Sequence, residues 1–166
     1  MKHILLFLLL TISSVCKSQI SVSPGSDGNK IMEACNILRQ HSPEIYNYVV
    51  QRSNIRSYLR NDGERLASTN SIEEGTYWIL IGIGSIRDRS VFHLASVIYH
   101  ESLHILAADH RIKRGESGYF LHLSGKQQKQ EEFSIYKMEI DLLIRMNSPK
   151  KEIQEIREWM EPYKSQ

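Results

Sequence analysis

The positions of hydrophobic and polar residues along the chain predict several helices and a small sheet. Apolar residues recur three or four positions apart, the spacing of an amphipathic helix, in residues 30–40, after Ser42-Pro43-Glu44, in residues 133–144 and after Ser148-Pro149. Residues 76–83 are aromatic and β-branched and end at glycines, which predicts a strand, and residues 55–60 predict a shorter one. Residues 68–75 and 85–89 are polar and predict loops. The pattern as a whole predicts an α+β fold.

One stretch, residues 91–106, is apolar on nearly every side, which is typical of a buried helix. It contains His100-Glu101-Ser102-Leu103-His104, in which the two histidines are four residues apart and therefore share one helix face. Buried polar groups are costly without partners, and a metal ion supplies a partner to both imidazoles. The alternative is two core histidines with ordinary hydrogen bonds and Glu101 in an ion pair. The context favours a metal site on His100 and His104.

The pattern His-Glu-x-x-His resembles the motif of the zincin metallopeptidases. The resemblance implies a bound zinc ion (Zn2+), a peptide or protein substrate, and Glu101 as the general base that takes a proton from a zinc-activated water. The order of a strand, a loop and then this helix also resembles the zincin fold, in which the substrate lies extended along the edge of the sheet. By this resemblance, residues 77–83 pack against the cleft or line it.

A catalytic zinc needs a third protein ligand, and Glu132 is the favoured residue. Phe133 and Tyr136 lie on the apolar face of the predicted helix 133–144, and Glu132 is one turn before Tyr136 at the edge of that face. This arrangement resembles the gluzincins, in particular small bacterial members, where a glutamate on a downstream helix completes the site. The resemblance implies a minimal zincin-like domain with a small sheet, a buried motif helix and a downstream helix that carries the third ligand.

Two other residues are alternatives for the third ligand. His110 stands at the spacing that metzincins use, but Ala107 replaces the glycine that turns their chain, and no methionine follows soon after. An unbroken helix would carry His110 away from the metal. Glu131 is the neighbour of Glu132, so that a shift of one residue in register would exchange them. An acidic first turn that complements the helix dipole is a further explanation of Glu131.

The first 18 residues have the features of a signal peptide. Lys2 begins an apolar run over residues 4–12 that is too short to cross a bilayer, and small and polar residues follow before Gln19. Cleavage after Ser18 predicts a single domain at residues 19–166, which is exported to the periplasm or secreted. Lipidation of Cys16, which would anchor the chain to a membrane, is the alternative.

The charge of the mature chain bears on its partners. Removing residues 1–18 takes away Lys2 and Lys17, so that Lys+Arg falls from 21 to 19, Asp+Glu stays at 19, and the formal charge becomes zero. We therefore expect no nucleic-acid partner. Because the apolar run lies within residues 1–18, we also expect no transmembrane segment in the mature chain. Cys35 is then the one cysteine left, which excludes an internal disulfide, and we expect it to be a small buried hydrophobic residue.

Together these features predict an exported zinc metallopeptidase that hydrolyses peptide bonds. Tyr119, His122 and Tyr136 are the nearby side chains able to donate a hydrogen bond to a developing oxyanion. His93, two turns before His100, is expected to be a hydrogen-bonded core histidine. Two other functions fit the same residues: a catalytically inactive zinc-binding module of zincin-like form, and an exported helical interaction protein with an accidental motif.

Overall fold

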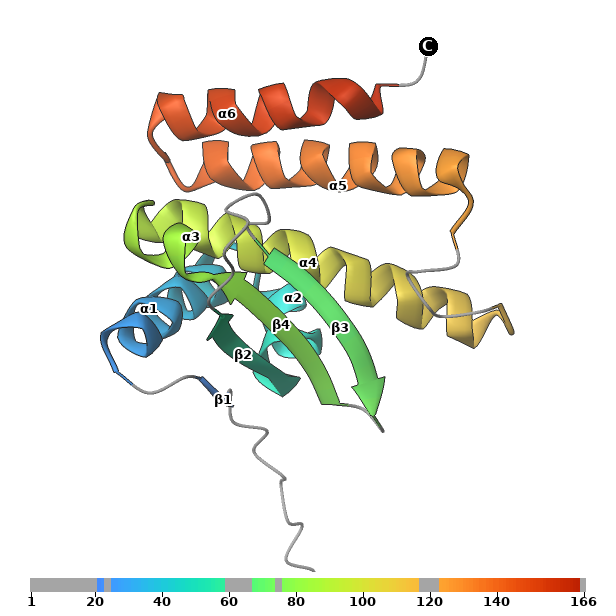
Figure 1. Cartoon of the computed structure of the whole chain (residues 1–166), viewed down its shortest axis with the longest axis horizontal. Helices are drawn as coiled ribbons and strands as arrows, with labels where there is room; N and C mark the ends of the chain where they lie inside the picture. The colour runs from blue at the N-terminus through green and yellow to red at the C-terminus, as the bar shows by residue number, and fades with distance from the viewer. Residues whose placement is uncertain (1–20, 23–24, 59–66, 74–75, 117–122, 165–166) are drawn as a thin grey trace, which may run out of the picture.

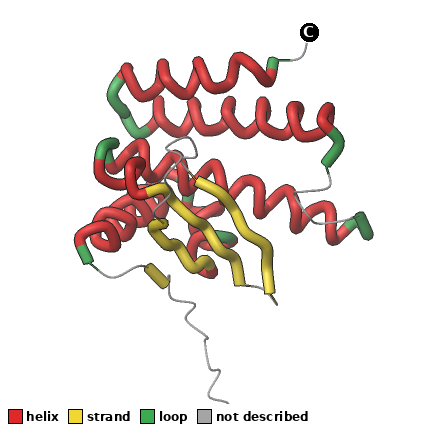
Figure 2. The backbone as a smooth tube through the Cα atoms, in the orientation of Figure 1, coloured by secondary structure: helices red, strands yellow, loops and turns green. Residues whose placement is uncertain are grey.

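The computed structural model describes residues 21–22, 25–58, 67–73, 76–116 and 123–164. In this part of the chain a small sheet stands beside a larger group of helices (Figures 1 and 2). The α+β fold class predicted from the sequence is therefore confirmed. The predicted signal peptide, residues 1–18, lies outside the described residues. Among the helices of the described ranges, none is both long and apolar enough to cross a membrane.

The sheet has four strands in the order β1-β2-β4-β3 and is mixed in direction. β1 (Ser21–Val22), β2 (Ser53–Tyr58) and β4 (Thr76–Gly82) are parallel, and Ile55 of β2 lies opposite Ile79 of β4. β3 (Ala67–Glu73) pairs antiparallel with β4 and forms the outer edge. The strands predicted at 55–60 and 76–83 thus correspond to β2 and β4.

Two segments predicted to be loops form regular structure instead. The loop predicted at 68–75 is wrong, because Ala67–Glu73 forms β3. An edge strand needs a backbone partner on one side only, and β4 supplies it, so that a polar sequence can pair here. The loop predicted at 85–89 is wrong in part, since Ile83–Arg87 forms the short helix α3. Because β4 is an inner strand, the sheet edge belongs to β3 and not to residues 77–83.

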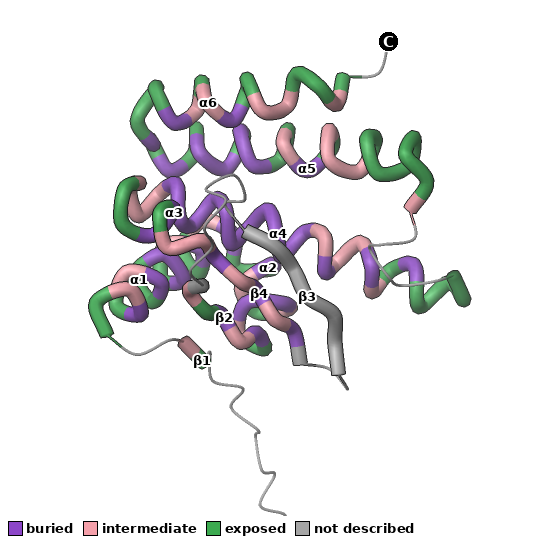
Figure 3. Tube along the Cα trace, viewed as in Figure 1, coloured by how far each residue is buried: buried purple, intermediate pink, exposed green. Residues whose placement is uncertain are grey.

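The longest helix, α4 (Val91–Lys113), lies at the centre of the fold and contains the His-Glu-x-x-His motif. It packs against α1 (Ser26–His41), against the sheet and against α5 (Gly125–Arg145). The last helix, α6 (Lys150–Met160), lies on the far side of α5, as Figure 1 shows. Figure 3 shows that the middle of α4 is buried, whereas α6 exposes its outer side. The motif therefore lies inside the molecule, between the sheet and the α5–α6 pair.

The shorter elements connect these layers. α2 (Pro43–Tyr48) and the 3-10 turn η1 (Val50–Arg52) lead from α1 into the sheet, and η3 (Glu161–Tyr163) follows α6. The hydrophobic core includes α1, β4 and α4, and Cys35 of α1 is 1% exposed within it. The prediction that Cys35 is a small buried hydrophobic residue is confirmed.

Serine caps fix where the two helices of the site begin. Ser90 accepts a hydrogen bond from the backbone N–H of His93 at 3.1 Å and so caps α4. Ser124 and Gln127 form a reciprocal capping box at the start of α5.

Candidate metal centre

His100 and His104 of α4 turn their imidazoles towards one carboxylate of α5. The Nε2 atom of His100 lies 3.4 Å from one carboxylate oxygen of Glu132, and the Nε2 atom of His104 lies 3.4 Å from the other. One ligand atom from each of the three residues lies within 4.8 Å of the others. The structure thus brings together the two motif histidines and Glu132, and these three residues can hold a metal ion.

The Nδ1 atom of His100 is held by a second carboxylate from α5. It lies 2.9 Å from Glu139, which is 2% exposed and also accepts a hydrogen bond from Ser96 at 2.8 Å. A carboxylate can only accept, so the Nδ1 atom of His100 bears the proton. This hydrogen bond fixes the tautomer and the rotation of the ring, and it leaves Nε2 as the atom that faces Glu132.

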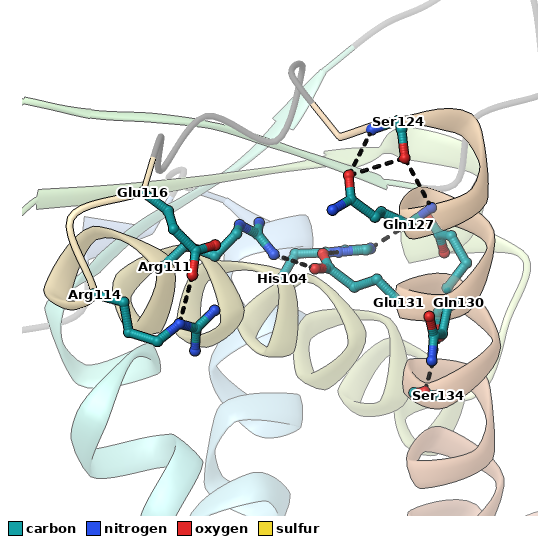
Figure 4. A network of polar contacts seen from close by, with 10 residues as sticks. His104, Arg111, Arg114, Glu116, Ser124, Gln127, Gln130, Glu131 and Ser134 are labelled. Atoms are coloured by element: carbon teal, nitrogen blue, oxygen red, sulfur yellow. Dashed lines mark hydrogen bonds and ion pairs between the residues drawn. The ribbon is translucent and has the colours of Figure 1, made fainter.

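His104 has an equivalent partner about two turns earlier on α5. Its Nδ1 atom lies 2.8 Å from Glu131, and the other oxygen of Glu131 pairs with Arg111. Figure 4 shows Glu131 of α5 reaching across to His104 and Arg111 of α4. Both motif histidines therefore have the same arrangement: a carboxylate on Nδ1, and Nε2 directed at Glu132.

This arrangement requires a positive charge between the imidazoles and Glu132. An imidazole that donates from Nδ1 has a lone pair on Nε2 when it is neutral, and a lone pair repels a carboxylate oxygen. A proton or a metal cation relieves the repulsion. The separation of 3.4 Å is longer than a good hydrogen bond, so the geometry suits a cation held between the groups better than a shared proton.

The protonation equilibria of the metal-free site show the same need for positive charge. Burial alone would lower the pKa of His100, but the neighbouring carboxylates of Glu132 and Glu139 outweigh burial and raise the pKa to about 10. Burial is likewise outweighed at His104, where Glu131 and Glu132 raise the pKa to about 9. The two imidazoles in turn hold the pKa of Glu132 at about 2, against the effect of burial. A divalent cation supplies the same charge as these two protons and would replace them.

Glu101 lies in the same buried part of α4 and is 8% exposed. Burial raises the pKa of its carboxyl group, whereas the neighbouring charges of His100 and His104 lower it, and burial prevails. A carboxylate whose pKa is raised is a stronger base than an ordinary surface glutamate. Glu101 is therefore suited to accept a proton beside the three ligands.

His110 lies away from this cluster. α4 continues without a break through Ala107 to Lys113, and His110 is exposed near its end. Its neighbour Asp109 instead accepts a hydrogen bond of 2.6 Å from the hydroxyl of Tyr77 on β4. Glu131, the other alternative to Glu132, is engaged by His104 and Arg111. The structure therefore favours Glu132 over both alternatives as the third ligand.

Aromatic rings line one side of the site. The Tyr136 ring is 4.7 Å from that of His100, measured between centroids, and 5.5 Å from the ring of Tyr163. Burial and the charge of Glu132 raise the pKa of Tyr136, so its hydroxyl stays protonated and can donate. The other two expected donors, Tyr119 and His122, lie outside the described residues.

His93 is buried, as expected, but the predicted hydrogen bond of its ring is wrong. It is 0% exposed, and neither ring nitrogen has a hydrogen-bond partner among the described residues. Its ring instead packs edge-on against Trp159 of α6, with 5.9 Å between centroids. The contact with Trp159 comes from α6, so periodicity along α4 alone does not show it.

Sequence reasoning also missed the roles of Glu139, Glu131 and Arg111 as partners of the site. A spacing signal was present, because Glu139 is seven residues after Glu132 and Arg111 is seven after His104, and residues two turns apart share a helix face. Spacing alone does not say which face meets which helix, and the pairing of α4 with α5 decides that.

Comparison with known proteins adds no relative to this description. No family model, no curated protein and no solved structure matches the chain.

Proposed function

We propose that the chain is an exported zinc-dependent metallopeptidase of gluzincin type. One observation supports it above the others: two imidazole Nε2 atoms and one carboxylate converge, with Glu101 beside them and a carboxylate fixing each ring from behind. Two histidines and a glutamate are the ligand set of a known class of catalytic zinc sites, in which water takes the fourth position. The proposal of export depends on the sequence of residues 1–18.

The chemistry of the ligand atoms supports zinc. Two imidazole nitrogens and one carboxylate oxygen, one from each residue, lie within 4.8 Å of one another, and zinc binds both kinds of ligand atom. When bound, zinc supplies Lewis acidity, which polarises the substrate carbonyl and makes water a better nucleophile at neutral pH.

The side chains of the site transfer the proton, position the histidines and stabilise the oxyanion. Glu101 accepts the proton that the attacking water loses and passes it to the leaving amine, so that the C–N bond breaks and an acid and an amine are released. Glu131 and Glu139 keep His104 and His100 in position. Tyr136, whose ring lies against His100, donates its hydroxyl proton in a hydrogen bond to the oxyanion that forms on the carbonyl.

The edge strand offers a place for the substrate backbone. β3 is the last strand of the sheet and packs near α4, the helix of the motif. An extended peptide can add to the edge of a sheet through main-chain hydrogen bonds, which requires no particular side chains of the substrate. We therefore assign the extended substrate of the zincin resemblance to β3.

The function is tested most directly by replacing the proposed base. Glu101→Gln keeps the size of the side chain and removes its ability to accept a proton, so we expect at least a ~100-fold loss of kcat with zinc content unchanged. Cleavage of a peptide library by the zinc-loaded wild type and variant is followed by mass spectrometry. Equal cleavage by both proteins would contradict the role of Glu101, and zinc binding without cleavage by the wild type would favour an inactive zinc-binding module.

The assigned hydrogen-bond donor has its own test. Tyr136→Phe keeps the ring against His100 and removes only the hydroxyl, so we expect kcat to fall by about 100-fold at unchanged zinc content. Tyr46→Phe, on α2, is the matched control and should leave kcat unchanged. Wild-type kcat in Tyr136→Phe would remove the hydroxyl from the mechanism.

A further inference from the structure

Two of the three guanidinium nitrogens of Arg111 have no partner among the described residues. Its Nη1 atom pairs with Glu131, whereas Nε and Nη2 are buried atoms with no hydrogen-bond acceptor in the part of the chain that the structure describes. The side chain is only 10% exposed. A buried donor without an acceptor is costly, and two on one charged group are rare in native structures.

The two unpartnered atoms form one edge of the planar guanidinium. Nε and Nη2 present two parallel N–H groups, which is the fork that binds a carboxylate through two hydrogen bonds. Glu131 occupies the remaining nitrogen, Nη1, and holds the plane of the group in place. The free fork is therefore fixed in orientation before any ligand arrives.

The position of Arg111 relates this fork to the metal ligands. Arg111 is seven residues after His104 on α4, roughly 10 Å along the helix axis, and a long helical side chain points back towards the N-terminus. The contact with Glu131 confirms this direction, because the same carboxylate also binds Nδ1 of His104. The guanidinium group is thus separated from the His104 ring by one carboxylate.

We propose that the free edge of Arg111 binds the C-terminal carboxylate of the peptide substrate, so that the protein cleaves near the C-terminal end. The proposal rests on the peptidase function proposed above. An extended peptide advances about 3.3–3.6 Å per residue. A terminal carboxylate on Arg111 therefore belongs to a residue within about three positions of the carbonyl at the metal ligands.

The charges around the fork favour a substrate terminus over an internal peptide carbonyl. Among the described residues Glu131 is the one anion paired with Arg111, and the N–H groups of Nε and Nη2 remain as donors for a second anion. A carboxylate matches both N–H groups and the charge, whereas an internal carbonyl offers one neutral oxygen. The terminal amide of a capped peptide has the same shape without the charge, and it is the natural comparison.

Binding is measured first, on the zinc-loaded full chain with Glu101→Gln, so that peptides stay intact. A panel of N-acetylated pentapeptides is prepared in matched acid and amide forms, and affinities are determined by calorimetry. We expect the acids to bind at least ~10-fold more tightly than the amides. Equal affinities for the two forms would overturn the proposal.

Two further substitutions identify the group responsible. Arg111→Lys keeps a cation beside Glu131 and removes the fork, so the ratio of acid to amide affinity should fall towards one. Arg114→Lys is the matched control, because Arg114 is exposed at the end of the same helix and pairs with Glu116 at 2.7 Å. A ratio that survives Arg111→Lys, or is lost in Arg114→Lys, would contradict the assignment.

Cleavage by the wild type separates this proposal from the function on which it rests. A preference for acids in binding, without cleavage of any peptide, would keep the subsite and overturn the peptidase. Cleavage of acids and amides at equal rates would keep the peptidase and overturn the subsite. Faster cleavage of acids, at a bond within about three residues of the C-terminus, is the result expected if both are right.

Discussion

At the scale of single residues, each of the two motif histidines has a carboxylate partner on its Nδ1 atom. Glu139 is almost completely buried, and it accepts two hydrogen bonds, one from the hydroxyl of Ser96 and one from Nδ1 of His100. Burying a carboxylate is costly unless its hydrogen bonds are satisfied, and here they are satisfied by the ring that faces Glu132. The buried Glu139 therefore holds the His100 ring in one orientation.

The role of Glu139 gives a prediction for metal affinity. Glu139→Gln keeps the shape and removes the charge behind His100, so we expect zinc affinity to fall by about 10- to 100-fold. Asp141→Asn, at an exposed position of the same helix, is the control and should leave the affinity unchanged. Competition with a chromophoric chelator measures both, and unchanged affinity in Glu139→Gln would show that His100 needs no positioning.

His93 gives a prediction for the dependence of stability on pH. Burial lowers its pKa, so the unfolded chain binds a proton near pH 6.5 that the folded chain does not bind. Unfolding is therefore favoured as the pH falls, and His93 should lower the free energy of unfolding between pH 6.5 and 5. Glu139, Glu152 and Glu155 oppose this shift, and Arg89 strengthens it.

The prediction is tested with His93→Phe, which keeps an aromatic ring against Trp159 and cannot take up a proton. Chemical denaturation at pH 8 and pH 5 should show a smaller loss of stability in the variant than in the wild type. His100 and His104 titrate in both proteins, so the difference between the two proteins isolates His93. Equal losses in both proteins would contradict the assignment.

At the scale of elements, the site depends on how α5 begins. Glu131 and Glu132 lie two turns into α5, whose first turn is held by the capping box of Ser124 and Gln127. Ser124→Ala should lower the free energy of unfolding by about 1 kcal/mol, because a backbone N–H at the helix start loses its acceptor. Ser134→Ala, which removes an exposed hydroxyl bonded within the same helix, is the control in thermal melts. Equal melting temperatures for the two variants would contradict a capping role.

The elements also show what the sequence can and cannot predict. Period and composition located α4, β2 and β4, because these elements are buried and their apolar residues show it directly. They missed β3, whose polar residues pair at the sheet edge through the backbone, and α3, which is a single short turn of helix after β4. The local pattern of apolar residues therefore predicts buried elements well, and it predicts the backbone pairing of an edge strand poorly.

Part of the site could likewise be predicted from the sequence, and part depends on how the helices pack. The shared face of His100 and His104 is a property of one helix and can be predicted from spacing. Glu132 was favoured from the apolar face of α5, whereas the separate tasks of Glu131, Glu139 and Arg111 depend on how α4 and α5 pack against each other. No spacing within one helix determines the rotation of its neighbour, which is why these three were missed.

At the scale of the whole molecule, the metal ligands join two separate layers. α4 packs on the sheet and α1, whereas α5 belongs to the pair with α6. His100 and His104 come from the first layer and Glu132 from the second, so a bound ion would tie them together. Any ion that binds the folded chain and not the unfolded one raises the apparent stability.

The most direct test is the zinc content of purified residues 19–166, measured by elemental mass spectrometry in the wild type, Glu132→Ala and His110→Ala. We predict about one zinc per chain in the wild type and in His110→Ala, and a loss of most of it in Glu132→Ala, because zinc then has two protein ligands instead of three. Zinc retained in Glu132→Ala but lost in His110→Ala, or no zinc in the wild type after zinc is added back, would contradict the metal centre described above.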